Sequence, residues 1–455
     1  MKRFLVVLLS LGMVMALSMS AFAVTPDFTG QYYARGSYIS NPSLLEQDQG
    51  TKRGPWGYYD QRLRMFFKLK IVEGVTFTTR ADALETVWGR NQDLYSLSDT
   101  GVKVKDFNSP NFAFERTQLD FKTGIGQFRV GYQGGTPYSW GTKFMNAPGT
   151  APGITWFNTF GPVTVLVDGN KKSKGDMTVA SKSTPDLEQS DVDNDYYDVG
   201  VKYKFKGGEA GFLGTYFRYA AKRELNPATA AATVKNFTDS VYNMQPYAKM
   251  KFGPVDLEAE AYWMKGQRAY DLAGTADMDI NTKGLYVNGK FNMGPAYVGG
   301  IFIYASGDDP TTTEQEGGYN KTLGYAVDTD IWGDISPAIM FADDYHDYLV
   351  TKGNAATLDK NMDNVFLYQL YGGFAVTKKL ALNAKFSYMK ADQVAAGYDD
   401  NYGKELDVKA TYKIYDKLSY NVGAAYLWTG DYFKGTKTAK VENNYYLSHW
   451  IDLRF

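Results

Sequence analysis

The sequence of 455 residues contains no cysteine and only two histidines. The absence of cysteine excludes disulfide bonds, cysteine-ligated zinc, iron–sulfur clusters and thiol nucleophiles. The histidines, His346 and His449, are far apart in the chain, and no Gly-x-Ser-x-Gly motif supplies a nucleophile to either of them. We therefore expect no catalytic residue, no metal site and no cofactor, and we do not expect an enzyme.

Long hydrophobic runs are also missing after the first residues, since none approaches the roughly 18 residues that a membrane helix needs. The N-terminal residues are different. Lys2 and Arg3 precede a short apolar run, Phe4 to Leu17, and Ala21-Phe22-Ala23 has the small-x-small form of a cleavage site. This order predicts a secretory signal peptide over residues 1–23, followed by a single domain over residues 24–455.

The sequence has no excess of basic charge. Removal of Lys2 and Arg3 with the predicted signal peptide leaves 47 of the 49 basic residues and all 50 acidic residues, which gives a net charge of −3. Nucleic-acid binding usually needs a clear basic excess, so we expect no nucleic-acid partner. The chain is instead rich in tyrosine (36), phenylalanine (27) and glycine (46), a composition typical of membrane β-barrels with aromatic girdles.

Hydrophobic and polar residues alternate over many segments of the mature chain, most clearly from Arg62 to Ile71. Such a period of two predicts β-strands with one apolar and one polar face. The segments are about 10–14 residues long, which suits tilted strands that cross a bilayer better than the shorter strands of a soluble sandwich. An apolar outer face is required, because each basic side chain turned toward lipid costs roughly 2–4 kcal/mol near the bilayer centre.

Tight turns and long polar connections alternate between these segments. Three of the turns share a Gly-Pro pair, at Gly161-Pro162, Gly253-Pro254 and Gly294-Pro295. About eight tight turns, with both chain ends on their side, predict an all-β transmembrane antiparallel β-barrel of about 18 strands. The hairpin at 153–169 has the weakest pattern, so 16 strands is the alternative.

The last residues, Tyr445 to Phe455, form an alternating strand that ends in phenylalanine. This ending resembles the assembly signal of Gram-negative outer-membrane porins, and the mature chain as a whole resembles a general or substrate-selective porin. The resemblance implies that Phe455 is read by the barrel-assembly machinery. It also implies location in the outer membrane among lipid and lipopolysaccharide, a homotrimer, and passive diffusion of small hydrophilic solutes or ions.

In porins of this kind the loop after the fifth strand folds inward and narrows the pore. The corresponding loop here is about Gly134 to Pro152, and the resemblance implies constriction residues Tyr138, Trp140 and Lys143 within it.

The polar faces of the strands predict the residues that line the pore. Basic and acidic candidates fall on different strands, and opposed charges across a pore bias its ion selectivity. The plainer interpretation is that these charges only solvate the lumen. The basic candidates are Arg62, Arg64, Lys68, Lys70, Arg80, Arg116, Lys122 and Arg129, and the acidic candidates are Asp256, Glu258 and Glu260.

The connection from about 307 to 363 is longer than ordinary loops, which suggests a function. Its length is equally consistent with a plug in the lumen and with a hairpin above the membrane. Two other functions remain open: a barrel that sheathes an electron-carrying cytochrome, and an adhesin or receptor that acts through its outer loops. Single-channel conductance distinguishes a porin from both.

Overall fold

The computed structural model describes residues 25–41, 44, 55–88, 112–134, 140–142, 144, 150–173, 193–220, 237–270, 275–319, 363–435 and 440–455. Within them the chain forms 18 strands and one short 3-10 helix, η2 (Asp431–Lys434). The strands are β1 (Thr25–Ile39), β2 (Trp56–Val72), β3 (Val75–Val87), β4 (Phe112–Thr123), β5 (Gly126–Gly134), β6 (Thr150–Phe160), β7 (Val163–Ser173), β8 (Asn194–Phe205), β9 (Gly208–Tyr219), β10 (Phe237–Phe252), β11 (Val255–Tyr270), β12 (Met278–Met293), β13 (Ala296–Ala305), β14 (Val365–Ala375), β15 (Leu380–Lys390), β16 (Asn401–Tyr415), β17 (Leu418–Thr429) and β18 (Asn444–Arg454).

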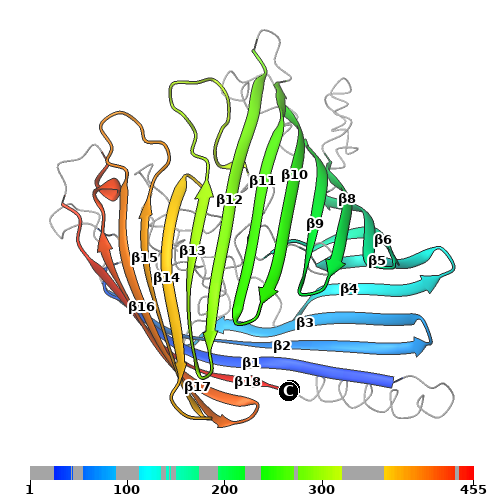
Figure 1. The fold of residues 1–455 in the computed structure, drawn as a ribbon, viewed down its shortest axis with the longest axis horizontal. Helices are drawn as coiled ribbons and strands as arrows, with labels where there is room; N and C mark the ends of the chain where they lie inside the picture. The colour runs from blue at the N-terminus through cyan, green and yellow to red at the C-terminus, as the bar shows by residue number, and fades with distance from the viewer. Residues whose placement is uncertain are drawn as a thin grey trace, which may run out of the picture.

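Every strand pairs antiparallel with its neighbours in the sequence, and β1 also pairs with β18. The closing register runs from Gln31 opposite Arg454 to Ile39 opposite Tyr446. Figure 1 shows β1 and β18 lying side by side, with the rest of the sheet curving round to meet them. The fold is therefore a closed 18-stranded antiparallel barrel, as predicted.

The hairpin with the weakest sequence pattern is present as β6 and β7, so the alternative of 16 strands is wrong. Its paired region extends beyond the alternating residues, because Gly153 pairs with Asn170 and the β7–β8 pairing continues to Ser173. In the part of the chain that the structure describes, no helix is long and apolar enough to span a membrane. The predicted signal peptide, 1–23, lies outside the described residues.

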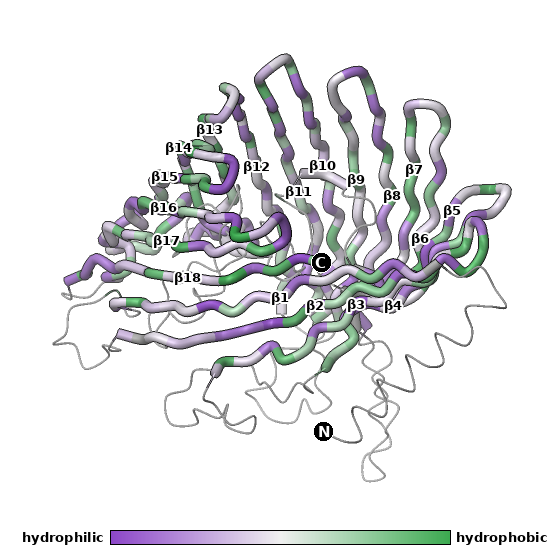
Figure 2. The backbone as a smooth tube through the Cα atoms, turned by 90° about the horizontal axis from the view of Figure 1, so that it is seen from below, coloured by the Kyte–Doolittle hydropathy of each residue, from purple (hydrophilic) through white to green (hydrophobic). Residues whose placement is uncertain are grey.

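The two faces of the wall differ in chemistry. The outward positions carry large apolar side chains, many of them more than a third exposed, while many inward positions are polar and buried. Figure 2 shows the resulting alternation of hydrophilic and hydrophobic residues along most strands. Since monomeric soluble proteins rarely expose so much contiguous apolar surface, the outer face is suited to lipid.

All eight predicted tight turns are found at one end of the barrel. In the three Gly-Pro turns the glycine is left-handed, with φ of +59° at Gly161, +56° at Gly253 and +61° at Gly294, which a side chain would disfavour. The proline carbonyl of each of these turns accepts a backbone hydrogen bond from the next hairpin, as from Lys204 to Pro162 at 2.9 Å. Each such turn is thereby tied to its neighbour around the rim.

Phe455 completes the closing seam. Its backbone exchanges two hydrogen bonds with Gly30, at 2.8 and 3.0 Å. Its ring lies 5.4 Å from the ring of Phe28, and a Cβ atom at Gly30 would come within 2.5 Å of it. The glycine therefore makes room for the terminal ring on the outer face.

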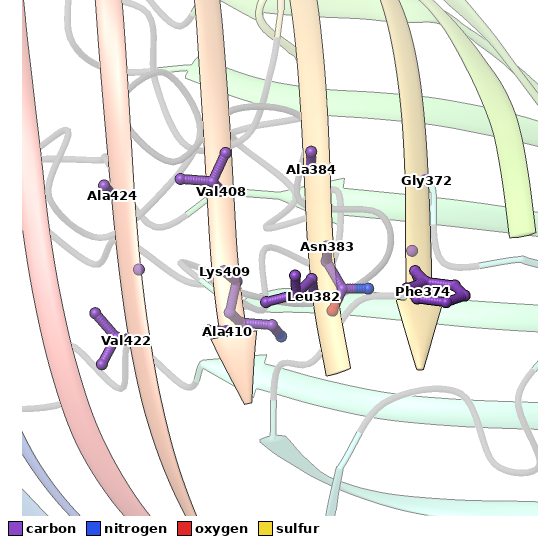
Figure 3. A pocket seen from close by; sticks show the side chains of 12 residues that line it. Gly372, Phe374, Leu382, Asn383, Ala384, Val408, Lys409, Ala410, Val422 and Ala424 are labelled. Carbon is purple, nitrogen blue, oxygen red and sulfur yellow. The ribbon is translucent and has the colours of Figure 1, made fainter. Parts of the chain in front are cut away.

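A shallow groove crosses the outer face of β14–β17 (Figure 3). Large apolar side chains, such as Phe374 and Leu382, border small residues there, including Ala384 and Ala424. The groove lies on the face opposite to the lumen, so it takes no part in lining the channel.

Candidate functional site: the lumen of the barrel

The basic residues predicted to line the pore lie on adjacent strands, β2 to β5. The strand pairing places them on one face, as shown by Arg64 opposite Asp82 and by Arg80 opposite Arg116. This face is opposite to the apolar outer side chains, so we refer to the inward surface of β1–β5 as the basic wall. Arg35 of β1 also belongs to it, because it pairs with Asp60.

Most arginines of the basic wall are held by carboxylates. Arg64 makes two hydrogen bonds with Asp82, at 2.7 and 2.6 Å, and Arg129 bonds to Asp120 at 2.8 Å. Arg80 pairs with Glu115. Such charge-assisted pairs fix the guanidinium groups in place.

Two irregularities in the strands supply some of these carboxylates. Glu115 lies at a register shift between β3 and β4, where Arg80 pairs with Arg116 and Ala81 pairs with Phe114. A second shift lies between β2 and β3, where Leu84 adopts a φ of +52° and Glu85 comes within 3.8 Å of Arg62. β-Bulges redirect side chains in this way. Here they bring Asp82, Glu85 and Glu115 together against the arginines.

Four basic residues of this wall make no ion pair within the described ranges: Arg116, Lys68, Lys70 and Lys122. The three lysines are exposed and lie toward the tight turns. Arg116 lies deeper, between Arg80 and the strand that carries Arg129, and its Nε atom is buried with no hydrogen-bond partner among the described residues. Arg116 is thus the arginine of this wall that is best placed to meet an anion.

The loop after β5 folds against the inner surface of β7–β12. Its described residues, Trp140, Gly141, Thr142 and Phe144, are called the inward segment below. Trp140 is 2% exposed and packs with Leu166 and Leu213. Its indole N–H donates to the Phe212 carbonyl at 3.2 Å, and the Nζ atom of Lys202 lies 4.9 Å from its ring centroid.

Gly200 provides the space that Trp140 occupies. A Cβ atom at Gly200 would lie 2.7 Å from two carbon atoms of the indole ring. Real Cβ atoms do not approach so closely, so any side chain at this position would move the tryptophan.

Glu260 of β11 holds the next residues of the inward segment. Its carboxylate accepts hydrogen bonds from the backbone N–H of Thr142, at 2.8 Å, and from the Thr142 hydroxyl. The side-chain amide of Gln245 donates to it as well. Gly141 passes over this carboxylate with a φ of +88°, and a Cβ atom there would lie 2.6 Å from Glu260 Oε1. A glycine and a buried acid thus let this part of the inward segment lie directly against the wall.

Phe144 ends the contact on an aromatic surface. Its ring centroid lies 5.6 Å from that of Tyr286, with an interplanar angle of 14°, and 5.7 Å from that of Tyr262. Tyr262 in turn lies against Gly284, where a Cβ atom would clash with its ring at 2.2 Å. The missing side chain of Gly284 therefore leaves room for the Tyr262 ring.

The three acidic candidates take different positions along β11. Glu260 is 1% exposed and is covered by the inward segment. Asp256 lies near the tight turns, 3.3 Å from Lys251 and 2.7 Å from the Asn292 amide. Glu258 lies between them on the same face. Among the constriction candidates, Trp140 is placed as described, whereas Tyr138 and Lys143 lie outside the described residues.

Part of the long connection also covers this wall. Gln315 exchanges backbone hydrogen bonds with Asp279 and Asn281, at 2.8 and 2.9 Å, along the part of β12 that extends beyond β13. Tyr319 is fully buried, and its hydroxyl donates to Asp239 Oδ2 at 3.0 Å. Up to Tyr319 the connection thus turns back onto the barrel. Residues 320–362, on which the choice between plug and hairpin depends, lie outside the described ranges.

A second buried polar group, formed by Asp168 of β7 and Asp198 of β8, was not predicted from the sequence. The two residues face each other in the strand register, and each is 2% exposed. Inward aspartates on consecutive alternating segments were the available signal, but the register that brings them together could not be read from the sequence.

His449 lies on the outer face of the barrel. Its two ring nitrogens are 3.3 Å from the Tyr59 hydroxyl and 3.4 Å from the Tyr420 hydroxyl. A position between two tyrosines on the outer wall gives it no contact with the lumen.

Comparisons with known proteins bear on the fold alone. No protein-family model and no curated protein sequence matches the chain. The crystal structure of OccK9 (OpdG) from Pseudomonas aeruginosa is similar, with a TM-score of 0.51 and 13% identity over 94% of this chain and 99% of that chain.

Two further crystal structures give slightly lower values. OpdK from Pseudomonas aeruginosa, solved with vanillate, has a TM-score of 0.49 and 13% identity over 94% of this chain and 98% of that chain. A BenF-like porin from Pseudomonas fluorescens Pf-5 has a TM-score of 0.49 and 11% identity over 94% and 99%. The likeness to OccK9 is therefore one of fold, along nearly the whole chain, without close sequence similarity.

Proposed function

We propose that this protein is an outer-membrane porin, a channel through which small hydrophilic solutes or ions diffuse passively. The observation that carries the proposal is a closed 18-stranded barrel with an apolar outside and a charged inner wall. A soluble barrel would not need the apolar outer face, and a lipid-filled barrel would not need the charged inner one. The segment folded against the inner wall supports the same interpretation, since inward loops narrow a channel.

The proposal includes the route to the membrane. Residues 1–23 act as a cleaved signal peptide, the barrel lies among lipid and lipopolysaccharide, and Phe455 is read by the barrel-assembly machinery. The place of Phe455 at the closing seam supports this role, since its backbone pairs with β1. Assembly as a homotrimer is part of the same proposal, and sedimentation of the detergent-solubilised protein tests it.

A preference for anions follows from the basic wall. Its arginines and lysines outnumber its carboxylates, and Arg116 and three lysines make no ion pair among the described residues. Fixed positive charge beside a narrow aqueous path raises the local concentration of anions. Arg116, at the depth of the ion-paired arginines, is the residue that most directly contacts a passing anion.

Planar-bilayer recordings of the purified protein test the proposal. We expect discrete conductance steps and, in a salt gradient, a reversal potential of the sign that indicates anion preference. Neutralising Arg62, Arg64 and Lys68 together moves the reversal potential toward cations, and Arg116→Gln moves it in the same direction. Lys378→Gln, in the tight turn between β14 and β15, is the control and leaves it unchanged.

Two results would contradict parts of this proposal separately. A folded protein that gives no conductance steps is not a porin, and the cytochrome sheath and the loop-based receptor then become the leading functions. Normal steps with an unchanged reversal potential in both basic-wall variants would retain the channel and remove the anion preference.

A further inference from the structure

Asp168 and Asp198 form a carboxyl pair inside the wall of the barrel. Both point inward from directly opposed positions of β7 and β8, and both are 2% exposed. Burying two carboxylates together is costly, because neither the solvent nor an opposite charge compensates for their repulsion.

Neighbouring side chains donate hydrogen bonds to the carboxyl oxygens of the pair. The Thr155 hydroxyl donates to Asp168 Oδ1 at 2.5 Å, and the Asn170 amide donates to Asp168 Oδ2. The Thr215 hydroxyl donates to Asp198 Oδ1 at 2.5 Å. The two carboxyl groups also hydrogen bond to each other. An ionised carboxylate only accepts hydrogen bonds, so one of the two groups must carry the proton that joins them.

The charged and titratable groups described around the pair do not neutralise its charge in place of that proton. Arg129 of β5 is nearby, but it is bonded to Asp120 at 2.8 Å. Tyr196 lies next to Asp198 on the inward face of β8, and Lys202 lies further along it, over the ring of Trp140. From β6 and β9 the pair meets the hydroxyls of Thr155 and Thr215. Among the described residues no Lys, Arg or His forms an ion pair with either aspartate.

The carboxyl pair adjoins the two residues on which Trp140 rests, Leu166 and Gly200, which together are called the seat of Trp140 below. On β7 the next inward residue after Asp168 is Leu166, and on β8 the next after Asp198 is Gly200. Leu166 packs on Trp140, and Gly200 lies directly under its ring. A change in the pair therefore acts on the two residues that position the inward segment.

We propose that Asp168 and Asp198 share one proton and form a latch that holds the inward segment against the wall until this proton is lost. The inference rests on the proposed channel function. With the proton in place, the pair bears a single negative charge and the wall packs tightly. When the proton leaves to water, two adjacent negative charges repel each other and attract water into the wall. The seat of Trp140 then loosens, and the channel widens as pH rises.

Single-channel recordings of the full-length protein over about pH 5 to about pH 9 test the latch. In the wild type we expect the ratio of wide to narrow states to rise with pH, by at most about tenfold per unit for a single linked proton. Asp198→Asn supplies a permanent N–H donor to Asp168 and removes the shared proton, so it keeps the narrow state at every pH. Asp416→Asn is the control, because this exposed acid lies in the tight turn between β16 and β17, outside the inner wall, and it retains the wild-type response.

Tryptophan fluorescence gives a second readout that does not require a conducting channel. The difference between the emission of the wild type and that of Trp140→Phe reports on the seat of Trp140. We expect this difference to shift to longer wavelength as pH rises, and to stay constant in an Asp198→Asn background. If the protein does not conduct but the fluorescence shifts as expected, the channel proposal fails and the latch is retained.

Several results would overturn the latch. They are a pH-independent wild type, an Asp198→Asn variant with the wild-type response, and a response that a chelator abolishes and calcium restores, which would mean that the pair holds a cation. If Asp198→Asn does not fold, Asp168→Asn provides the same test from the other strand.

Discussion

The basic wall on β1–β5 and the wall on β8–β12 use polar groups in opposite ways. On the basic wall, carboxylates pair with arginines and leave a net positive surface, with four basic residues that make no ion pair in the described part of the chain. On the other wall, Glu260 and the tyrosines are buried and bind the inward segment. Under the proposed channel function, one side of the lumen would meet the solute while the other would set the width of its path.

Of the variants that test this difference between the walls, removal of the Glu260 carboxylate should change the channel most. Glu260→Ala leaves the buried N–H and hydroxyl of Thr142 without an acceptor, at a cost of about 1–3 kcal/mol for each buried group. The population of molecules with the inward segment in its bound position, relative to the released position, should then fall by at least about tenfold. We expect higher conductance and more frequent switching in single-channel recordings.

Two variants on the same strand serve as controls. Glu260→Gln keeps an oxygen acceptor and should largely restore the wild-type conductance. Asp256→Ala removes a carboxylate from the same strand near the tight turns, where its partners are Lys251 and Asn292. If Asp256→Ala raises conductance as much as Glu260→Ala does, the effect comes from lost charge, and the two walls do not differ as argued.

A second comparison separates two kinds of arginine within the basic wall. Arg64→Gln leaves Asp82, whose side chain is 4% exposed, without its bidentate partner, and should cost up to about 3 kcal/mol of stability. Arg116→Gln removes no ion pair and should leave the urea midpoint nearly unchanged while it weakens anion preference. Equal losses of stability in the two variants would contradict this distinction.

The smallest effect is expected at the long connection, outside the strands. Hydrogen bonds from the side chain and backbone of Thr311 lower the pKa of Asp309. A lowered pKa means that this turn is stabilised at neutral pH and loses that contribution as pH falls through the folded pKa. Amide hydrogen exchange at Thr311 should therefore speed up on acidification, relative to its intrinsic rate. In Asp309→Asn this relative change should disappear, since the amide oxygen accepts the same bonds at every pH.

The strands and turns could be predicted because their signals are local. Alternation fixes which side chains face outward, and Gly-Pro pairs mark turns that require a left-handed glycine. The same local information predicted the inward charges, whereas the loop that contains Trp140 was predicted from the resemblance to porins.

The contacts between distant strands could not be predicted in the same way. Glu115 meets Arg80 at a register shift, and such a shift leaves no clear trace in an alternating pattern. Glu260 resembles any lumen-facing acid until the inward segment covers it. Gly200, an inward glycine within the strand Asp198 to Lys202, was a usable signal, because strand glycines often mark a close approach of another group. Its partner, Trp140, is 60 residues away and could not be identified from that signal alone.

The pairing of β1 with β18 restricts the order in which the barrel can assemble. The residues that meet there, such as Gln31 and Arg454, are separated by nearly the whole described chain. Neighbouring hairpins can form early, since their loops are short, but this last pairing must wait until the final strand has arrived. Until then the sheet has two unpaired edges, each able to join a foreign strand. A cell that makes this barrel therefore has to shield those edges for the whole interval between the appearance of the first strand and that of the last.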